Sequence, residues 1–239
     1  MRQGIILAAG LGTRLPEITV KTPKSLIRVN SKPILERNID FMFEAGLERA
    51  ILVLGYMKER FEYLQEKYGK RIILVENKEY ASSNTVSSMN CASQFFTCDS
   101  FVTTADIYLK INPFEKYVAD YSFYLLRPYL SFQKPDWVAM LDDENRFISV
   151  DTHSTEGFSY TGISFWKYQD LLYIKKKLQA IEWNDKHQRK QYWDELLLND
   201  FDEIAVRARI LESNDEVYEF DDMGDVEELK NSDHVLIEW

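Results

Sequence analysis

The sequence predicts an α/β fold in which helices cover both faces of a mostly parallel β-sheet. Short apolar runs alternate with helical patterns through the first 120 residues, which is typical of parallel strands joined by crossover helices. The first apolar run leads directly into a glycine-rich, basic loop. Beyond residue 120, extended runs follow one another more closely, which indicates mixed or antiparallel additions to the sheet.

Four apolar runs predict the strands of the first half. They cover residues 3–8, 50–54, 71–75 and 100–104. The first contains the unbroken sequence Ile5-Ile6-Leu7, which is typical of a strand that is covered on both faces. We therefore expect it to lie inside the sheet.

Three helices are predicted between these strands. The first spans residues 33–45, opens with Pro33 and stops at Gly46, and both residue types suit those positions. Its apolar face consists of Leu35, Ile39, Met42 and Phe43. The second spans residues 58–68. The third follows the polar residues 82–84 and carries Val86, Met89 and Phe96.

The second half is predicted to mix extended runs with helices. The extended runs are residues 121–127, 137–141, 147–150, 160–166, 204–207 and 216–220, with a turn at 142–145. The helices are residues 168–181, 190–198 and 223–230. Because no repeat or linker interrupts the pattern, we expect one domain over residues 1–239. We expect two halves within this domain, residues 1–120 and residues 121–239.

The composition excludes several classes of protein. A chain of 239 residues can bury about 70–75% of its unfolded surface, so it needs no disulfide framework. Cys91 and Cys98 have no partner pair of histidines, which predicts reduced packing residues in a cytoplasmic protein. The net charge of −10 argues against nonspecific binding of nucleic acid or of an anionic membrane. Neither a signal peptide nor a membrane span is expected.

The loop after the first strand has the residues that a nucleoside triphosphate requires. Gly10 and Gly12 let the main chain turn and approach a ligand closely. Arg14 offers a planar fork of donors for phosphate oxygens, and Lys24 offers a compact ammonium for the charge that develops on the phosphoryl group.

The loop has two other interpretations. A dinucleotide-binding fold requires a third glycine, but Leu15 stands there, and Pro16 and Pro23 oppose an immediate helix. An ordinary glycine-rich turn would leave Arg14 and Lys24 merely solvated. The Pro-Lys pair at this spacing makes that second interpretation weaker.

Three acidic residues are candidates for a metal site. Asp106 follows a buried strand, at the edge where open α/β sheets bind ligands. Glu219 and Asp221 share a face if their segment is a strand. Magnesium accepts such carboxylates together with phosphate oxygens. Each acid has an alternative role as a turn, cap or solvated residue, and Asp222 is interpreted as the N-cap of the last helix.

These residues resemble the nucleotidyltransferase family, and within it the bacterial choline-phosphate cytidylyltransferase branch. The signature comprises residues 7–14, Leu-Ala-Ala-Gly-Leu-Gly-Thr-Arg, together with Thr22-Pro23-Lys24. Further similar segments are Lys32-Pro33-Ile34-Leu35, Gly55-Tyr56, Ala105-Asp106, Asp136-Trp137, Tyr192-Trp193-Asp194 and Tyr218-Glu219-Phe220-Asp221. The resemblance implies a Rossmann-like three-layer fold of the nucleotide-diphospho-sugar transferase type with a small substrate-binding insertion.

The resemblance also implies roles for individual residues. Arg14 and Lys24 would be catalytic, and Asp106, Glu219 and Asp221 would bind Mg²⁺. The nucleotide would be held by Leu7, Ala8, Ala9, Gly10, Gly12, Asn84, Ser88 and Ala105. The acceptor would be held by Trp137, Tyr192, Trp193 and Asp194. Residues 1–120 would accordingly be the nucleotide-binding half of the domain, and residues 121–239 the acceptor-binding half.

The expected reaction is the attack of an acceptor phosphate or phosphonate oxygen on the α-phosphorus of CTP. A quaternary ammonium is attracted to aromatic faces and to a carboxylate, which favours phosphocholine as the acceptor. Taken singly, tryptophans and tyrosines in strands and helices are more typical of a core. Alternatives are 2-aminoethylphosphonate, a sugar 1-phosphate, and a nucleotide-binding regulatory protein without turnover. We expect a monomer or homodimer.

Overall fold

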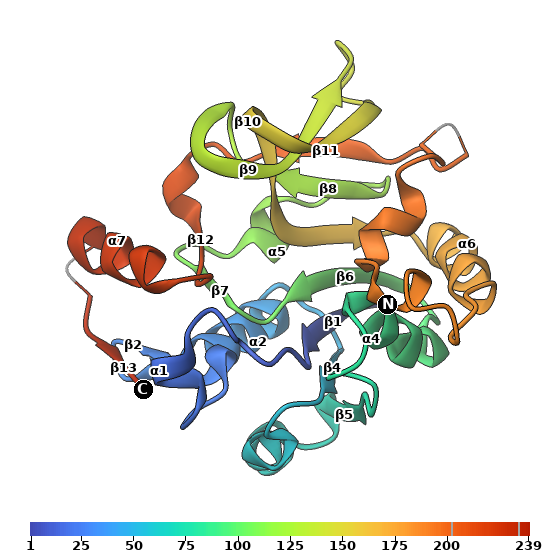
Figure 1. Ribbon diagram of the computed structural model, residues 1–239. Helices are drawn as coiled ribbons and strands as arrows, with labels where there is room; N and C mark the ends of the chain where they lie inside the picture. The colour runs from blue at the N-terminus through green and yellow to red at the C-terminus, as the bar shows by residue number, and fades with distance from the viewer. Residues whose placement is uncertain (202, 234) are drawn as a thin grey trace.

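A computed structural model describes residues 1–201, 203–233 and 235–239, and its main feature is an eight-stranded mixed sheet (Figure 1). The strand order is β11-β8-β10-β6-β1-β4-β5, and β9 pairs with β10 outside this path. The strands are β1 (Arg2–Ala8), β4 (Arg49–Leu54), β5 (Ile72–Glu76), β6 (Asp99–Thr104), β8 (Phe123–Leu126), β9 (Leu130–Leu141), β10 (Phe147–Trp166) and β11 (Arg207–Ile210).

The first half of the chain forms the parallel part of this sheet, as the sequence predicts. Strand β1 lies between β6 and β4, and β5 follows β4, all in parallel register. Leu7 is opposite Val53 on one side and Thr104 on the other. The carboxyl ends of these strands therefore meet at one edge, and the glycine-rich loop and Asp106 follow from that edge.

Helices cover both faces of the sheet (Figure 1). Because side chains alternate along β1, Ile5 packs on one face and Ile6 on the other. The Ile5 face is covered by α4 (Thr85–Ala92) and α6 (Tyr168–Gln179). The Ile6 face is covered by α2 (Ile34–Glu44), α3 (Tyr63–Tyr68) and α5 (Pro113–Lys116). This arrangement confirms the predicted three-layer α/β architecture.

One long strand joins the second half of the chain to the first. Strand β10 pairs antiparallel with β6, β8 and β9, so residues before and after 120 share the same sheet. The sequence predicts two separate runs here, residues 147–150 and 160–166, but the strand is continuous over 20 residues. Its middle alternates between exposed and half-buried residues that lack the apolar pattern of a core strand, which is why the sequence prediction breaks it.

The remaining described strands form two small antiparallel sheets. Strand β12 (Val217–Glu219) pairs with β7 (Ile107–Leu109), which places Glu219 opposite Ile107. Strand β13 (Ile237–Glu238) pairs with β2 (Arg28–Val29), which also pairs with β3 (Lys32–Pro33). The first pairing matters most, because it brings the C-terminal acidic segment to the end of β6.

The remaining helices are short, except for α7 (Met223–Asp233). Helix α1 (Pro16–Thr19) starts at Pro16, so the prediction that this proline opposes a helix is wrong. Proline at a first helical position needs no N–H partner and already has a helical φ. The 3₁₀ helices are η1 (Lys24–Leu26), η2 (Lys58–Phe61), η3 (Gly69–Arg71), η4 (Ser93–Phe95), η5 (Gln188–Lys190), η6 (Trp193–Leu197) and η7 (Asn214–Glu216).

Several predicted boundaries differ from the structure. The predicted helix 58–68 is divided into η2 and α3, and the predicted helix 190–198 is two 3₁₀ turns instead. Phe96 lies beyond α4, after η4. The predicted strand 204–207 begins only at Arg207. The spacing of apolar residues predicts that these segments are buried. Whether their backbone forms an α-helix, a 3₁₀ turn or a strand depends on tertiary contacts.

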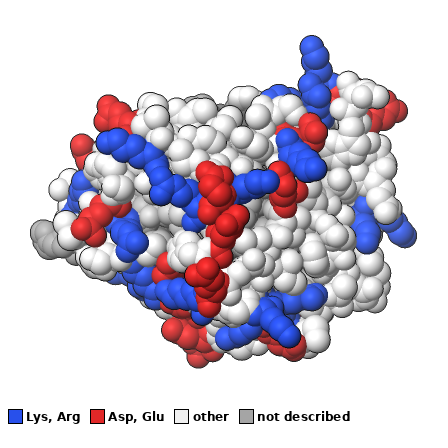
Figure 2. Space-filling model, turned by 90° about the horizontal axis from the view of Figure 1, so that it is seen from below, with Lys and Arg blue, Asp and Glu red and all other residues white. Residues whose placement is uncertain are grey.

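Charged groups are mixed over the face shown in Figure 2. Lysine and arginine side chains lie next to aspartate and glutamate side chains there, with a row of acidic groups near its centre. On this face the structure therefore shows no broad basic surface. Among the described helices, none is both long and apolar enough to cross a membrane.

Candidate active site

The centre of the candidate site is a network of ion pairs between segments that are far apart in the sequence. The Lys24 Nζ lies 2.9 Å from Asp106 Oδ2 and 3.0 Å from Asp221 Oδ1. Arg14 Nη1 lies 2.5 Å from Asp221 Oδ2. The Lys24 side chain is only 12% exposed, whereas that of Arg14 is 65% exposed. The two predicted catalytic cations therefore converge on two of the predicted metal ligands.

Local structure explains how these groups meet. Pro23 is followed at once by η1, which begins at Lys24. Asp106 lies two residues beyond the end of β6. The Phe220 N–H donates to the Asp106 carbonyl at 2.9 Å and so extends the pairing of β12 with β7. That contact brings Glu219 and Asp221 to Asp106.

The three carboxylates form a group that fits a divalent cation. One oxygen each from Asp106, Glu219 and Asp221 lies within 4.8 Å of the others, and no other such group was found in the described part of the chain. The second oxygen of Asp106, Oδ1, is buried and has no hydrogen-bond partner among the described residues. A buried polar atom of this kind is costly unless a ligand satisfies it. Carboxylate oxygens are suitable ligands for a hard cation such as Mg²⁺ or Ca²⁺.

The charges of this group are strongly interdependent. Burial acts to raise the pKa of Asp106, but the facing Lys24 ammonium outweighs it and lowers that pKa below its ordinary value. Burial acts to lower the pKa of Lys24, but Asp106 and Asp221 overcome this effect and raise it. Burial, together with the negative charges of Asp106 and Asp221, raises the pKa of Glu219 to about 8. An incoming cation would relieve this repulsion.

A first cavity of about 340 Å³ lies over the glycine-rich loop. Its lining includes every residue predicted to hold the nucleotide: Leu7, Ala8, Ala9, Gly10, Gly12, Asn84, Ser88 and Ala105. Gly12 has φ +65°, and a Cβ there would lie 2.5 Å from Thr19 Cγ2. A Cβ at Gly10 would meet no protein atom within 4 Å. The turn therefore requires glycine at 12, while at 10 the main chain is open to a ligand.

The start of α4 forms the opposite wall of this cavity. Asn84 caps the helix, because its Oδ1 accepts the Thr85 N–H at 2.8 Å. Ser88 Oγ accepts the side-chain amide of Asn77 at 3.0 Å. Asn77 is itself 1% exposed and was not predicted as a site residue. Its place after β5, at the same edge as Asp106, is a signal that could have identified it.

A second, larger cavity of about 1050 Å³ is lined by both aromatic and acidic side chains. Its aromatic residues, here called the aromatic wall, are Tyr124, Trp137, Tyr160, Tyr192 and Trp193. The Trp137 ring lies 5.7 Å from the Tyr192 ring at 72° and 6.1 Å from the Tyr160 ring at 87°, centroid to centroid. Tyr124 and Tyr160 also line the cavity but were not predicted. They lie on β8 and β10, whose pairing brings the Tyr124 ring to 4.9 Å from the Tyr160 ring, centroid to centroid. The pairing of β10 with β9 brings Tyr160 beside Trp137.

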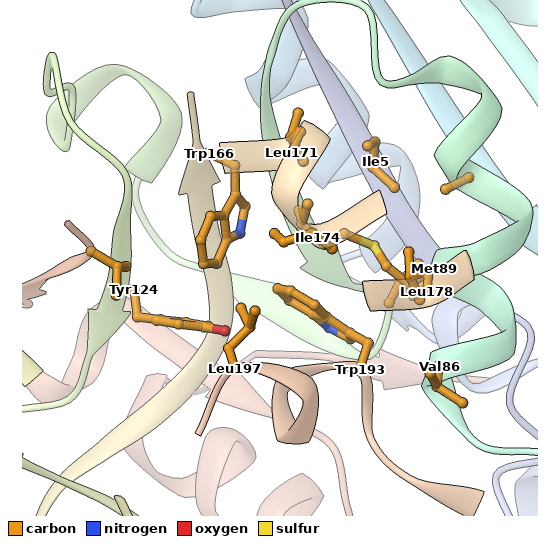
Figure 3. Close-up of a cluster of buried hydrophobic side chains, with 14 of the residues drawn as sticks. Ile5, Val86, Met89, Tyr124, Trp166, Leu171, Ile174, Leu178, Trp193 and Leu197 are labelled. Atoms are coloured by element: carbon orange, nitrogen blue, oxygen red, sulfur yellow. The ribbon is translucent and has the colours of Figure 1, made fainter. Parts of the chain in front are cut away.

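Trp193 belongs mainly to the hydrophobic core. It is 4% exposed, and its ring packs against Trp166 at 5.8 Å and Tyr124 at 6.2 Å (Figure 3). The residue also borders the larger cavity. Tyr192, by contrast, is 44% exposed and lines both cavities. Of the two alternatives that the sequence leaves open, the packing favours core for Trp193 and contact with a ligand for Tyr192.

Asp194 places a carboxyl group against the aromatic wall. Its Oδ1 accepts the Tyr124 hydroxyl at 2.9 Å. Burial raises the pKa of Asp194 to about 7, although the bond from Tyr124 acts in the opposite direction. Near neutral pH the group is therefore easily ionised, and a cation in the cavity would favour the ionised form.

The two cavities meet at the ion-pair network. Both are lined by Leu7, Arg14, Thr104, Tyr192, Glu219 and Asp221. A ligand over the glycine-rich loop and a second ligand in the aromatic cavity would thus approach each other beside Glu219 and Asp221. This arrangement suits a group transfer between a triphosphate and a small acceptor.

Comparison with protein families defines the class of the protein. The chain belongs to the nucleotidyl transferase family, whose model matches residues 3–123. More specifically, it is 33% identical to the choline-phosphate cytidylyltransferase of Streptococcus pneumoniae, over 95% of this chain and 96% of that protein. It is also 33% identical to the choline-phosphate cytidylyltransferase of Haemophilus influenzae, over 92% and 93% of the two chains. A 2-aminoethylphosphonate cytidylyltransferase of Lancefieldella rimae is 32% identical, over 96% and 91%.

Solved structures agree with this assignment. The CTP:phosphocholine cytidylyltransferase of Streptococcus pneumoniae superimposes with a TM-score of 0.87, covering 96% of this chain and 98% of the other at 33% identity. An inositol-1-phosphate CTP transferase of T. maritima has a TM-score of 0.74 at 19% identity, covering 97% and 95%. The second match shows a shared fold only. Together they confirm the predicted nucleotide-diphospho-sugar transferase type of fold.

Proposed function

We propose that this protein transfers CMP from CTP to phosphocholine, which gives CDP-choline and pyrophosphate. The observation that carries the proposal is the meeting of two cavities at Arg14, Glu219 and Asp221, beside the ion pair of Lys24 and Asp106. One cavity has the glycine-rich loop that suits a triphosphate, and the other has the aromatic and acidic groups that suit a quaternary ammonium. The relatives named choline-phosphate cytidylyltransferase, which match over almost the whole chain, support the same reaction.

In the proposed complex the triphosphate lies over the loop at residues 9–14. Main-chain N–H groups near Gly10 approach the phosphates, and Arg14 is exposed enough to turn from Asp221 towards them. Ala8, Ala9, Asn84 and Ser88 border the base and ribose. Free thiols at Cys91 and Cys98 agree with a cytoplasmic location, where CTP is used.

Asp106, Glu219 and Asp221 would hold Mg²⁺ in this proposal. The metal would neutralise phosphate charge and orient the triphosphate when bound. The unpartnered Asp106 oxygen and the raised pKa of Glu219, which burial causes first and neighbouring acids second, support a cation at this position.

For this reaction the protein has to position the two substrates and stabilise the charge that develops during transfer. A phosphate oxygen of the acceptor forms a bond to the α-phosphorus of CTP while the bond to the β-phosphate oxygen breaks, and that oxygen leaves with pyrophosphate. The acceptor phosphate is already an anion, so no general base is required. Lys24 lies beside the carboxylates, where it can follow the charge that develops during transfer.

The trimethylammonium group of the acceptor is proposed to lie against Trp137 and Tyr192. Each favourable ring contributes about 0.5–2 kcal/mol to such a cation. Asp194 supplies a carboxylate on the same wall and raises the preference for a cation over a neutral sugar.

A second candidate acceptor is 2-aminoethylphosphonate. Asp136, Asp194 and Glu228 all line the larger cavity. A primary ammonium can donate hydrogen bonds to such carboxylates, whereas a quaternary ammonium cannot. The relative from Lancefieldella rimae, named for this substrate, supports the alternative.

A substrate panel tests the proposal. The purified protein is incubated with Mg²⁺ and each of CTP, UTP, GTP, ATP and dTTP, and pyrophosphate release is measured. The acceptors are phosphocholine, 2-aminoethylphosphonate, phosphoethanolamine and hexose 1-phosphates. Fastest release with CTP and phosphocholine is expected. Release only with a hexose phosphate would contradict the acceptor, and no release with any pair would support the regulatory alternative.

A further inference from the structure

Asp225 holds the segment that carries Asp221. One oxygen of its carboxylate, Oδ2, accepts the main-chain N–H of Asp221 at 2.7 Å and that of Asp222 at 2.7 Å. The Asp225 side chain is thus bonded to the backbone of the residue whose own carboxylate pairs with Lys24 and Arg14. No motif in the sequence singles out this residue.

The contact is an extended form of a helix cap. Helix α7 begins at Met223, and Asp222 Oδ1 accepts the Gly224 N–H at 2.8 Å. In an ordinary capping box, an acid in the first turn reaches back to one main-chain N–H just before the helix. Asp225 reaches one residue further. It therefore fixes the orientation of the peptide that leads into the Asp221 side chain.

The helix that carries Asp225 is firmly anchored. Val226 and Leu229 are fully buried and pack in a cluster with Leu15, Ile18 and Phe220. The same cluster includes residues that follow the glycine-rich loop and residues on both sides of the acidic segment. The packing of α7 in the core consequently fixes the position of Asp225. The hydrogen bonds of Asp225 can in turn fix the backbone of Asp221.

We propose that Asp225 is a positioning residue that sets the orientation in which Asp221 binds the divalent cation. This inference rests on the proposed role of Asp221 as a metal ligand. Partners that orient a metal ligand typically change metal affinity by about 10–100-fold when they are removed. A cap that served α7 alone would change stability but not metal affinity, so the two roles can be distinguished.

The test measures Mn²⁺ binding to the full-length protein by electron paramagnetic resonance, in the presence of CTP and without acceptor. Asp225→Ala removes the acceptor of both N–H groups and is expected to weaken Mn²⁺ binding at least about tenfold. Asp225→Asn keeps an acceptor oxygen but removes the charge, and it is expected to bind Mn²⁺ almost as well as the wild type.

Two control variants separate positioning from other effects. Asp222→Ala removes the bond to Gly224 in the same helical turn, so it matches the loss of a cap. Glu227→Ala removes an exposed charge from the same helix at a position that lines neither cavity. Both are expected to leave Mn²⁺ affinity within about threefold of the wild type, and thermal unfolding in each variant measures the loss of stability.

The outcomes distinguish this inference from the proposed function. Unchanged Mn²⁺ affinity in Asp225→Ala would overturn the inference. Equal weakening in Asp225→Asn and Asp225→Ala would also overturn it, because charge rather than the two hydrogen bonds would then be responsible. Failure of the wild type to bind Mn²⁺ would contradict the metal role of Asp221 itself. If Mn²⁺ binds as expected but CMP is transferred to another acceptor, the inference stands while the proposed acceptor fails.

Discussion

The ammonium of Lys24 lies 2.9 Å from the carboxylate of Asp106, although 82 positions separate the two residues in the chain. Lys24 also contacts Asp221, which lines both cavities, so this ion pair balances charge beside their junction. A bound triphosphate and its cation would redistribute the same charges, since phosphate oxygens compete for Lys24 and the cation competes for the aspartates.

Lys24→Ala is expected to lower turnover by at least about a hundredfold, because the ammonium is needed chiefly while charge develops on the transferred group. Steady-state pyrophosphate release measures this effect. Circular dichroism in the presence of Mg²⁺ checks that the variant is folded. Lys32→Ala, which removes a more exposed lysine paired with Asp40, serves as the matched control. Near-normal turnover in folded Lys24→Ala would show that Lys24 does not stabilise the charge that develops during transfer.

Asp106→Asn is expected to abolish the dependence of activity on Mg²⁺ and to reduce turnover by several orders of magnitude. The amide keeps the size of the side chain but removes the charge, and it can no longer pair with Lys24 in the same way. Turnover is measured across a series of Mg²⁺ concentrations, with Asp215→Asn as an exposed control. An unchanged Mg²⁺ response would show that the ion lies elsewhere.

Cation binding is expected to strengthen as the pH rises through about 7, because burial raises the pKa of Asp194 to about 7. Below this pH the folded protein holds Asp194 protonated, whereas the unfolded chain ionises it near pH 4. The free energy of unfolding without ligand therefore loses this contribution as the pH rises from about 4 to 7.

Choline itself is the probe for this pH effect, because it has no group that titrates in the range. Tryptophan fluorescence is followed from pH 6 to pH 8, and an increase in affinity of up to about tenfold is expected from the change in ionisation. In Asp194→Asn the increase in affinity between pH 6 and pH 7 should disappear, whereas an increase near pH 8 should remain, because Glu219 lines the same cavity and burial raises its pKa to about 8. An increase between pH 6 and pH 7 that persists in this variant would assign the effect to another group.

Trp137→Ala is expected to raise the KM for phosphocholine by about 5–30-fold, which corresponds to the loss of one cation–π contact of about 1–2 kcal/mol. The KM for CTP should change little, because Trp137 lines only the larger of these two cavities. Trp239→Ala, at an exposed tryptophan away from both linings, is the control. Equal increases in both KM values would indicate a general structural defect instead of a lost acceptor contact.

Much of the fold was predictable from local patterns. The unbroken apolar run at Ile5-Ile6-Leu7 predicted a strand covered on both faces, and β1 lies inside the sheet. The helix at residues 33–45 is predicted from Pro33, Gly46 and its apolar face, and α2 (Ile34–Glu44) agrees. Such patterns depend on neighbours in the sequence, which act before any tertiary contact.

The errors fall where distant contacts determine the local structure. The long strand β10 is continuous because it pairs with β9. No alternation of apolar residues in the sequence predicts that pairing. The turns at η5 and η6 take the place of a predicted helix because their backbone bonds to α4, as in the contact from the Asn84 N–H to the Arg189 carbonyl at 3.0 Å. Tyr124 and Tyr160 join the aromatic wall through strand pairing alone.

The sequence by itself determined the chemistry that this protein can perform. The glycine-rich loop with Arg14 and Lys24 is a local motif, and the acids at 106, 219 and 221 are the residue types that a triphosphate and its cation require. Only the tertiary structure decided which of these groups act together. The pairing of β12 with β7 brings Glu219 to Asp106, and Asp225 fixes the peptide before Asp221. The physical reason is that charges interact over a few ångströms, and positions far apart in the chain reach that distance only after the core has formed.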